Sequence, residues 1–180
     1  TDMSNLRLIN QTTTTVANTI SITDVFSADF DIYKIVISGL NQDTNVANEI
    51  NGIRLINSSG SVITSSDYDY AVLGMNSGSS FDKTKSTSAS DIFMGQRADQ
   101  VGDGSNNTVF YVFNPFDSST YTFTLSQSAS SDSAFDNINA KGIGVLQQTN
   151  SITGFQIYDS DSARPFESGS KIITYGLRVD

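Results

Sequence analysis

The chain alternates between short apolar runs and polar turn clusters. From residue 20 onward, runs rich in Ile, Val, Tyr and Phe are separated by clusters of Ser, Asn, Asp and Gly. This spacing is typical of β-strands joined by turns, and it predicts an all-β fold, an antiparallel β-sandwich of jelly-roll type in one domain over residues 20–180. We expect about ten strands, drawn from residues 20–26, 30–38, 53–57, 62–64, 68–73, 91–95, 108–114, 121–125, 142–147, 152–158 and 171–179.

Two of the predicted strands are apolar on both sides. Residues 30–37 and 109–113 carry large apolar side chains on both sides, more than a half-exposed strand needs. Each is therefore either a central strand of the sandwich or a contact between subunits. In the second segment we expect Phe110 and Val112 at such a contact.

A third strand shows strict alternation. Tyr121, Phe123 and Leu125 alternate with threonines at 120, 122 and 124, which predicts one packed side and one solvated side. The usual assumption is that the apolar set is the packed one.

The first 19 residues are mostly polar, with one apolar patch at Leu6, Leu8 and Ile9. Such a segment is either an edge strand or an arm that becomes ordered on a partner. We expect residues 1–18 to dock on a partner, with those three apolar residues at the contact. The start of the chain has no signal-peptide pattern, so we expect synthesis in the cytoplasm.

Three segments of low complexity are predicted to be outward-facing loops. They cover residues 76–90, 98–107 and 126–136 and consist mainly of Ser, Asp, Asn, Thr and Gly.

The residue composition excludes several function classes. The chain has no Cys and no His, so disulfides, the common zinc sites and triads built on His or Cys are absent. Its net charge of −9 opposes binding to nucleic acid, and no apolar run approaches the length of a membrane span. We expect no enzymatic activity, because no spacing singles out a pair of catalytic carboxylates.

Two kinds of ligand stay open. Calcium needs clustered oxygen ligands, and Asp99, Asp103 and Asn106 are the first candidates, although turn formation explains them better. A glycan would need exposed aromatic rings near loops, and we take Tyr68, Tyr70, Phe81 and Phe116 as candidates. Most aromatic residues of a sandwich belong to its core.

Two C-terminal segments resemble the structural proteins of tailed bacteriophages. They read SITGFQIY at 151–158 and FESGSKIITYGL at 166–177, and the earlier IRLINSSG and YDY stretches look similar to the same group. We expect the two segments to form a hairpin in which Phe155 and Ile157 interlock with Ile173, Tyr175 and Leu177.

The resemblance implies a virion protein made in the host cytoplasm, such as a capsid decoration or cement protein, or a tail or fibre component. It implies self-association, commonly as a homotrimer, and docking on other virion proteins, and it transfers no active site. The alternative is a carbohydrate-binding module that recognises the host surface.

Overall fold

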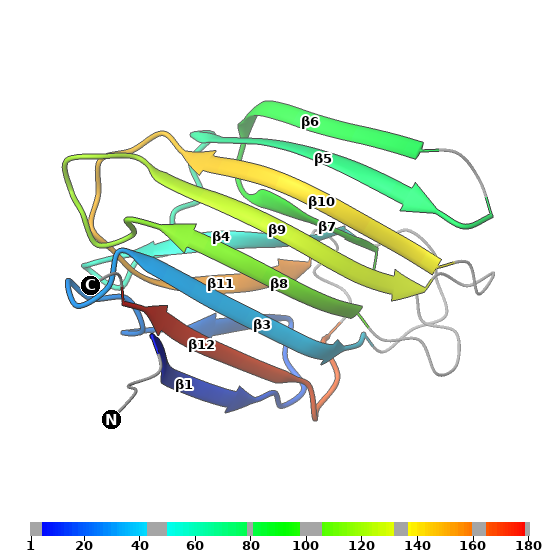
Figure 1. Cartoon of the computed structure of the whole chain (residues 1–180), viewed down its shortest axis with the longest axis horizontal. Helices are drawn as coiled ribbons and strands as arrows, with labels where there is room; N and C mark the ends of the chain where they lie inside the picture. The colour runs from blue at the N-terminus through cyan, green and yellow to red at the C-terminus, as the bar shows by residue number, and fades with distance from the viewer. Residues whose placement is uncertain are drawn as a thin grey trace.

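A computed structural model describes residues 5–42, 50–78, 81–97, 106–131, 137–159 and 165–178, and these contain strands and no helix. The described residues form twelve strands (Figure 1), namely β1 (Leu6–Thr13), β2 (Thr19–Ile22), β3 (Ile32–Leu40), β4 (Ile50–Asn57), β5 (Tyr68–Asn76), β6 (Phe81–Ala89), β7 (Ile92–Arg97), β8 (Asn106–Phe113), β9 (Thr122–Ser131), β10 (Asn137–Leu146), β11 (Ile152–Asp159) and β12 (Lys171–Leu177).

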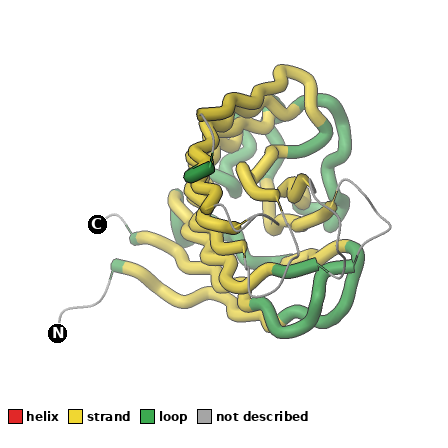
Figure 2. The backbone as a smooth tube through the Cα atoms, turned by 90° about the vertical axis from the view of Figure 1, so that its right-hand side faces the viewer, coloured by secondary structure: helices red, strands yellow, loops and turns green. Residues whose placement is uncertain are grey.

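The strands form two antiparallel sheets of unequal size. The larger sheet has the order β1-β12-β3-β8-β9-β10-β5-β6, and the smaller has the order β2-β11-β4-β7. Figure 1 shows the larger sheet in front of the smaller one, and Figure 2 shows the two layers from the side. The prediction of an all-β antiparallel sandwich is confirmed.

A hydrophobic core fills the space between the two sheets. Tyr33, Ile35 and Ile37 of β3 point inward, and they are fully buried together with Phe155 and Ile157 of β11. The Tyr33 hydroxyl donates to the Ser27 carbonyl at 2.9 Å and accepts from the Ser27 amide at 2.8 Å, so its burial leaves no polar group unsatisfied.

The apolar strands β3 and β8 lie third and fourth of the eight strands. Phe110 and Val112 of β8 are fully buried on the inner side. The expectation that these two residues contact a partner is therefore wrong, because the core already encloses them.

Strand β7 packs very closely on β9 and β10 because the residues between them are small. A Cβ atom added to Gly144 of β10 would lie 2.7 Å from Cγ2 of Ile92, and one added to Gly95 would lie 2.6 Å from Cβ of Ala140. Gly95 also has a positive φ of 78°, which favours glycine.

Strand β9 buries its polar side and exposes its apolar side, which is the reverse of the usual assumption. Thr122 and Thr124 are buried on the inner side, while Phe123 and Leu125 point away from the core and are 52% and 39% exposed. Three serines continue the buried row, at Ser126, Ser128 and Ser130. The narrow space beside β7 accepts these small side chains and has no room for the large ones.

Several other expectations are corrected. Residues 81–89, predicted as part of a loop, form the edge strand β6, and residues 126–131 extend β9. Residues 62–64 make only an isolated bridge between Val62 and Ile56. Strands β11 and β12 lie in different sheets and do not form a hairpin.

Candidate interaction surface

The most unusual feature of the molecule is the side of the larger sheet that faces away from the smaller sheet, called here the outer face. Register and burial place apolar side chains on this face in all eight strands. They are Leu6 and Leu8 on β1, Ile173, Tyr175 and Leu177 on β12, Ile32 and Val36 on β3, Val109, Tyr111 and Phe113 on β8, Phe123 and Leu125 on β9, Ile143 and Val145 on β10, Ala71, Leu73 and Met75 on β5, and Phe81 on β6.

Many of these side chains are open to solvent. Phe81 is 72% exposed, Ile143 57% and Leu73 52%. Among the described residues, most of the large exposed hydrophobic side chains lie on this one face; Val16, Phe116 and Tyr121 lie elsewhere. A contiguous apolar surface of this kind marks a contact with another molecule.

The outer face also carries all five lysines of the chain. Alternation along the strands places Lys34 on β3, Lys83 and Lys85 on β6, Lys141 on β10 and Lys171 on β12 on this side. The only carboxylate among the described strand residues of the face is Asp69 of β5, which accepts a hydrogen bond from Nε2 of Gln147 at 2.6 Å. The face is therefore apolar and positively charged in a chain of net charge −9.

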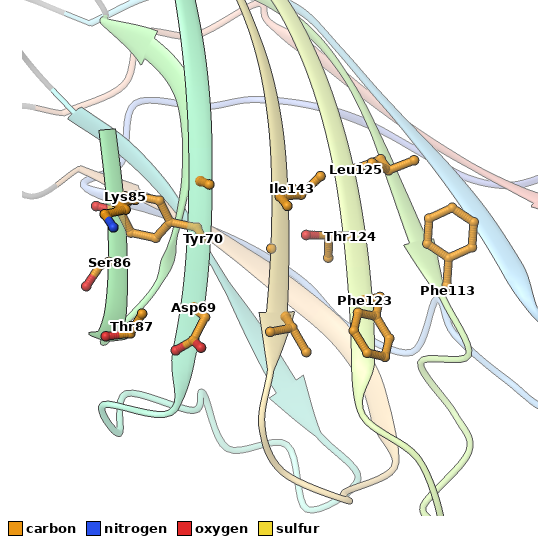
Figure 3. Close-up of a pocket in the computed structure, with 13 residues that line it drawn as sticks. Asp69, Tyr70, Lys85, Ser86, Thr87, Phe113, Phe123, Thr124, Leu125 and Ile143 are labelled. Atoms are coloured by element: carbon orange, nitrogen blue, oxygen red, sulfur yellow. The ribbon is translucent and has the colours of Figure 1, made fainter. Parts of the chain in front are cut away.

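A groove crosses the outer face from β6 to β8. One hollow of about 460 Å³ is lined by Asp69, Lys85, Phe123, Ile143 and Val145 among others. Figure 3 shows Asp69, Lys85, Phe123 and Ile143 on neighbouring strands. An adjoining hollow of about 840 Å³ shares Ala71, Lys85 and Ile143 with the first and adds Lys83 and Lys141. We call these two hollows together the lysine groove.

The open side of the smaller sheet is polar instead. Gln156 donates from Nε2 to Oγ of Ser21 at 3.0 Å, and the guanidinium of Arg54 lies 3.6 Å from the ring centre of Tyr158. The Tyr158 hydroxyl donates to Oδ2 of Asp91 at 2.5 Å. Burial, followed by this bond, raises the pKa of Tyr158 to about 12. Only the larger sheet, then, presents an apolar open side.

The structure does not bring the predicted glycan-binding aromatics together. Tyr68 is fully buried, and its hydroxyl donates to the Ile63 carbonyl at 3.1 Å. Tyr70 packs inward against Phe93. Phe81 lies opposite Met75 at one end of the sheet, and Phe116 follows β8 at the other end.

The other predicted site residues also lie in different parts of the molecule. Leu6 and Leu8 lie on the outer face, but Ile9 is partly buried and packs on the core beside a bulge in β1. Asp99 and Asp103 lie outside the described residues, while Asn106 is buried at the start of β8. No group of three or more acidic residues that could hold a metal ion occurs in the part of the chain that the structure describes.

Comparisons with models of protein families, with curated proteins and with solved structures find no match. The resemblance to phage structural proteins therefore stays a prediction. Within the described ranges, there is no helix long and apolar enough to cross a membrane.

Proposed function

We propose that the chain is a non-catalytic structural subunit of a larger protein assembly, which associates with neighbouring copies through the outer face of its eight-stranded sheet. The arrangement of β9 carries this proposal. The strand exposes Phe123 and Leu125 and buries Thr122 and Thr124, which is unfavourable in water unless another molecule covers the exposed side.

The size of the outer face fits a stable contact. Eight strands about 4.8 Å apart, each with roughly six residues that rise about 3.4 Å, span on the order of 800 Å². A standard protein–protein contact buries about 800 Å² on each partner.

The wider setting that we propose is the virion of a tailed bacteriophage, with a capsid decoration, tail or fibre subunit as the role. The resemblance of residues 151–158 and 166–177 supports this setting, and the apolar outer face supports the self-association that it implies.

A glycan-binding module is the second candidate, and the rings of Phe113 and Phe123, which line the same hollow as Asp69, favour it. The groove offers few polar partners near those rings, whereas sugar recognition needs several hydrogen bonds. A glycan-array screen of the wild-type chain tests this candidate directly.

Sedimentation velocity over a wide range of protein concentrations tests the proposed association. We expect the average mass of the wild-type chain to rise above the 19.4 kDa of one copy as its concentration rises. The double variant Phe123→Ser with Leu125→Ser should stay at one copy and keep its urea midpoint, because neither side chain belongs to the core.

Val16→Ser is the matched control, because Val16 is 65% exposed but lies outside the outer face. This variant should associate as the wild type does. A wild-type chain that stays single at every concentration would contradict the proposal.

A further inference from the structure

The charge on the outer face restricts the way in which two copies can meet. The described strand residues of the face include five lysines and one carboxylate, a net charge of +4. Since the whole chain carries −9, the rest of the chain carries −13.

A face-to-face contact between two copies would be electrostatically unfavourable. In a two-fold symmetric contact the same surface is used on both sides, so the lysines of one copy would lie among the lysines of the other. Like charges brought together in a contact oppose association. The face is suited to a surface that combines carboxylates with apolar side chains.

The chain itself has such a surface at one end of the sandwich, which we call the acidic tip. It consists of the loops at residues 23–31, 58–67, 114–121 and 147–151, which gather at the left of Figure 1. These loops contain no Lys or Arg, and they carry five aspartates, namely Asp24, Asp29, Asp31, Asp67 and Asp117.

Hydrogen bonds between the loops hold the acidic tip together. The Asn114 amide donates to the Asp31 carbonyl at 2.6 Å, and the Ile152 amide donates to the Pro115 carbonyl at 2.7 Å. The Gln147 amide donates to the Asp67 carbonyl at 2.8 Å. A tip that is ordered in advance loses less conformational entropy when it binds.

The tip combines ionised carboxylates with exposed rings. The hydroxyl and the amide of Ser119 donate to Oδ1 of Asp117 at 2.7 and 2.8 Å, and these bonds lower the pKa of the Asp117 carboxyl. Hydrogen bonds from Ser65 and Gln148 lower the pKa of Asp67. Phe116 is 36% exposed and Tyr121 44%.

From this complementarity we infer that copies of the chain associate head to tail, with the acidic tip of one copy seated in the lysine groove on the outer face of the next. This inference rests on the proposed self-association and specifies its geometry. A head-to-tail contact uses two different surfaces of each copy, so it continues into a ring or an open filament.

Charge reversal on each surface separately tests the inference. The groove variant is Lys83→Glu with Lys85→Glu, and the tip variant is Asp29→Lys with Asp31→Lys. Each should lower the association constant by at least about tenfold, because like charges then meet across the contact. All four side chains are exposed, so neither variant should lose its β-sheet circular dichroism.

Two further samples show whether the groove and the tip contact each other. An equimolar mixture of the groove and tip variants should regain assembly, since each reversed surface then meets its complement. A single chain with all four substitutions should regain it as well. The matched controls are Lys83→Arg with Lys85→Arg, which keeps the charge, and Asp82→Lys, which reverses a charge on the inner side of β6. Both controls should associate as the wild type does.

A tip variant that associates as strongly as the wild type would overturn the head-to-tail contact, because a face-to-face contact does not use the tip. Failure of both the mixture and the fourfold variant to regain assembly would overturn it as well. In either case the association of the wild type would still stand, and only a wild type that stays single removes the proposed function.

Discussion

Single side chains in the interior show how narrow the space between the sheets is beside β7. Thr124 is 3% exposed, and its Oγ1 has no hydrogen-bond partner among the described residues. A buried hydroxyl without a partner usually costs about 1–3 kcal/mol. The chain tolerates this cost at β9 because Thr124 lies beside the close contact between Gly144 and Ile92, where a large side chain has no room.

Adding one methyl group at Gly144 tests this close approach. In Gly144→Ala the new Cβ atom would lie 2.7 Å from Cγ2 of Ile92 and 2.8 Å from Oγ1 of Thr124, so the strands must move apart. We expect a loss of about 1–3 kcal/mol in the free energy of unfolding, measured by urea titration. Gly74→Ala is the control, because its Cβ atom would meet Asp82 at an ordinary 3.7 Å. An equal loss in both variants would contradict the explanation.

Tyr158 should make the stability of the protein sensitive to high pH. Its pKa is raised from 10.0 to about 12 in the folded chain, chiefly by burial, so the neutral hydroxyl is favoured by folding. The stability that this provides is complete below pH 10 and is lost as the pH rises toward 12.

Urea midpoints at about pH 9 and about pH 11 measure this dependence. The midpoint of the wild type should fall more between the two conditions than that of Tyr158→Phe, which has no group to ionise there. Equal falls in the two proteins would show that Tyr158 does not ionise differently in the folded and unfolded chains.

At the scale of strands, the sequence predicts those that build the core and fails where burial does not follow hydrophobicity. The runs at β3, β8 and β11 stand out because their apolar residues are β-branched or aromatic and lie between turns. Strand β6 escapes detection because it is an edge strand with most side chains exposed, so no buried side leaves an apolar pattern.

The inner and outer sides of β9 could not be assigned from its own residues. Alternation reveals that the strand has two different sides, but the residues of β7 decide which side faces inward. The same limit applies to β12, where Ile173, Tyr175 and Leu177 form an evident apolar row that the structure places outside.

Removing β1 should leave the sandwich folded. The strand pairs only with β12 in the larger sheet, and none of its side chains is fully buried. Deletion of residues 1–13 keeps Thr14, whose Oγ1 accepts from the Ser170 amide at 3.0 Å and donates to the Glu167 carbonyl at 2.9 Å. We expect β-sheet circular dichroism to persist with a single, lower urea midpoint. Loss of the folded signal would mean that β1 is essential to the core.

At the scale of the whole molecule, the separation of charge becomes visible only when the strand order is known. The five lysines are scattered along the sequence from Lys34 to Lys171. They share one face for two reasons. Their strands, β12 and β3 and then β10 and β6, belong to the same sheet, and each lysine occupies a position of its strand that points outward. The acidic tip arises in the same way, from four loops that the topology brings to one end.

Association should weaken as salt is added. Charges at the rim of the lysine groove are exposed, and screening shortens the range of their attraction from about 14 Å at 0.05 M salt to about 4 Å at 0.5 M. We expect the association constant, measured by sedimentation, to fall over this range in the wild type. Association that strengthens with sodium chloride would indicate a contact held by apolar burial alone.

The close packing of β7 on β9 also determines the register in which β9 pairs with its neighbours. A slip of β9 by one residue against β8 and β10 would turn Phe123 and Leu125 inward and the threonines outward. Hydrophobicity alone favours the slipped register, because that register would remove two large apolar side chains from water. Ile92 and Gly95 of β7 lie too close to β9 for Phe123 and Leu125 to fit inside, so the width of the interior determines the register. Smaller residues on β7 would therefore let one sequence fold with β9 in either of two competing registers.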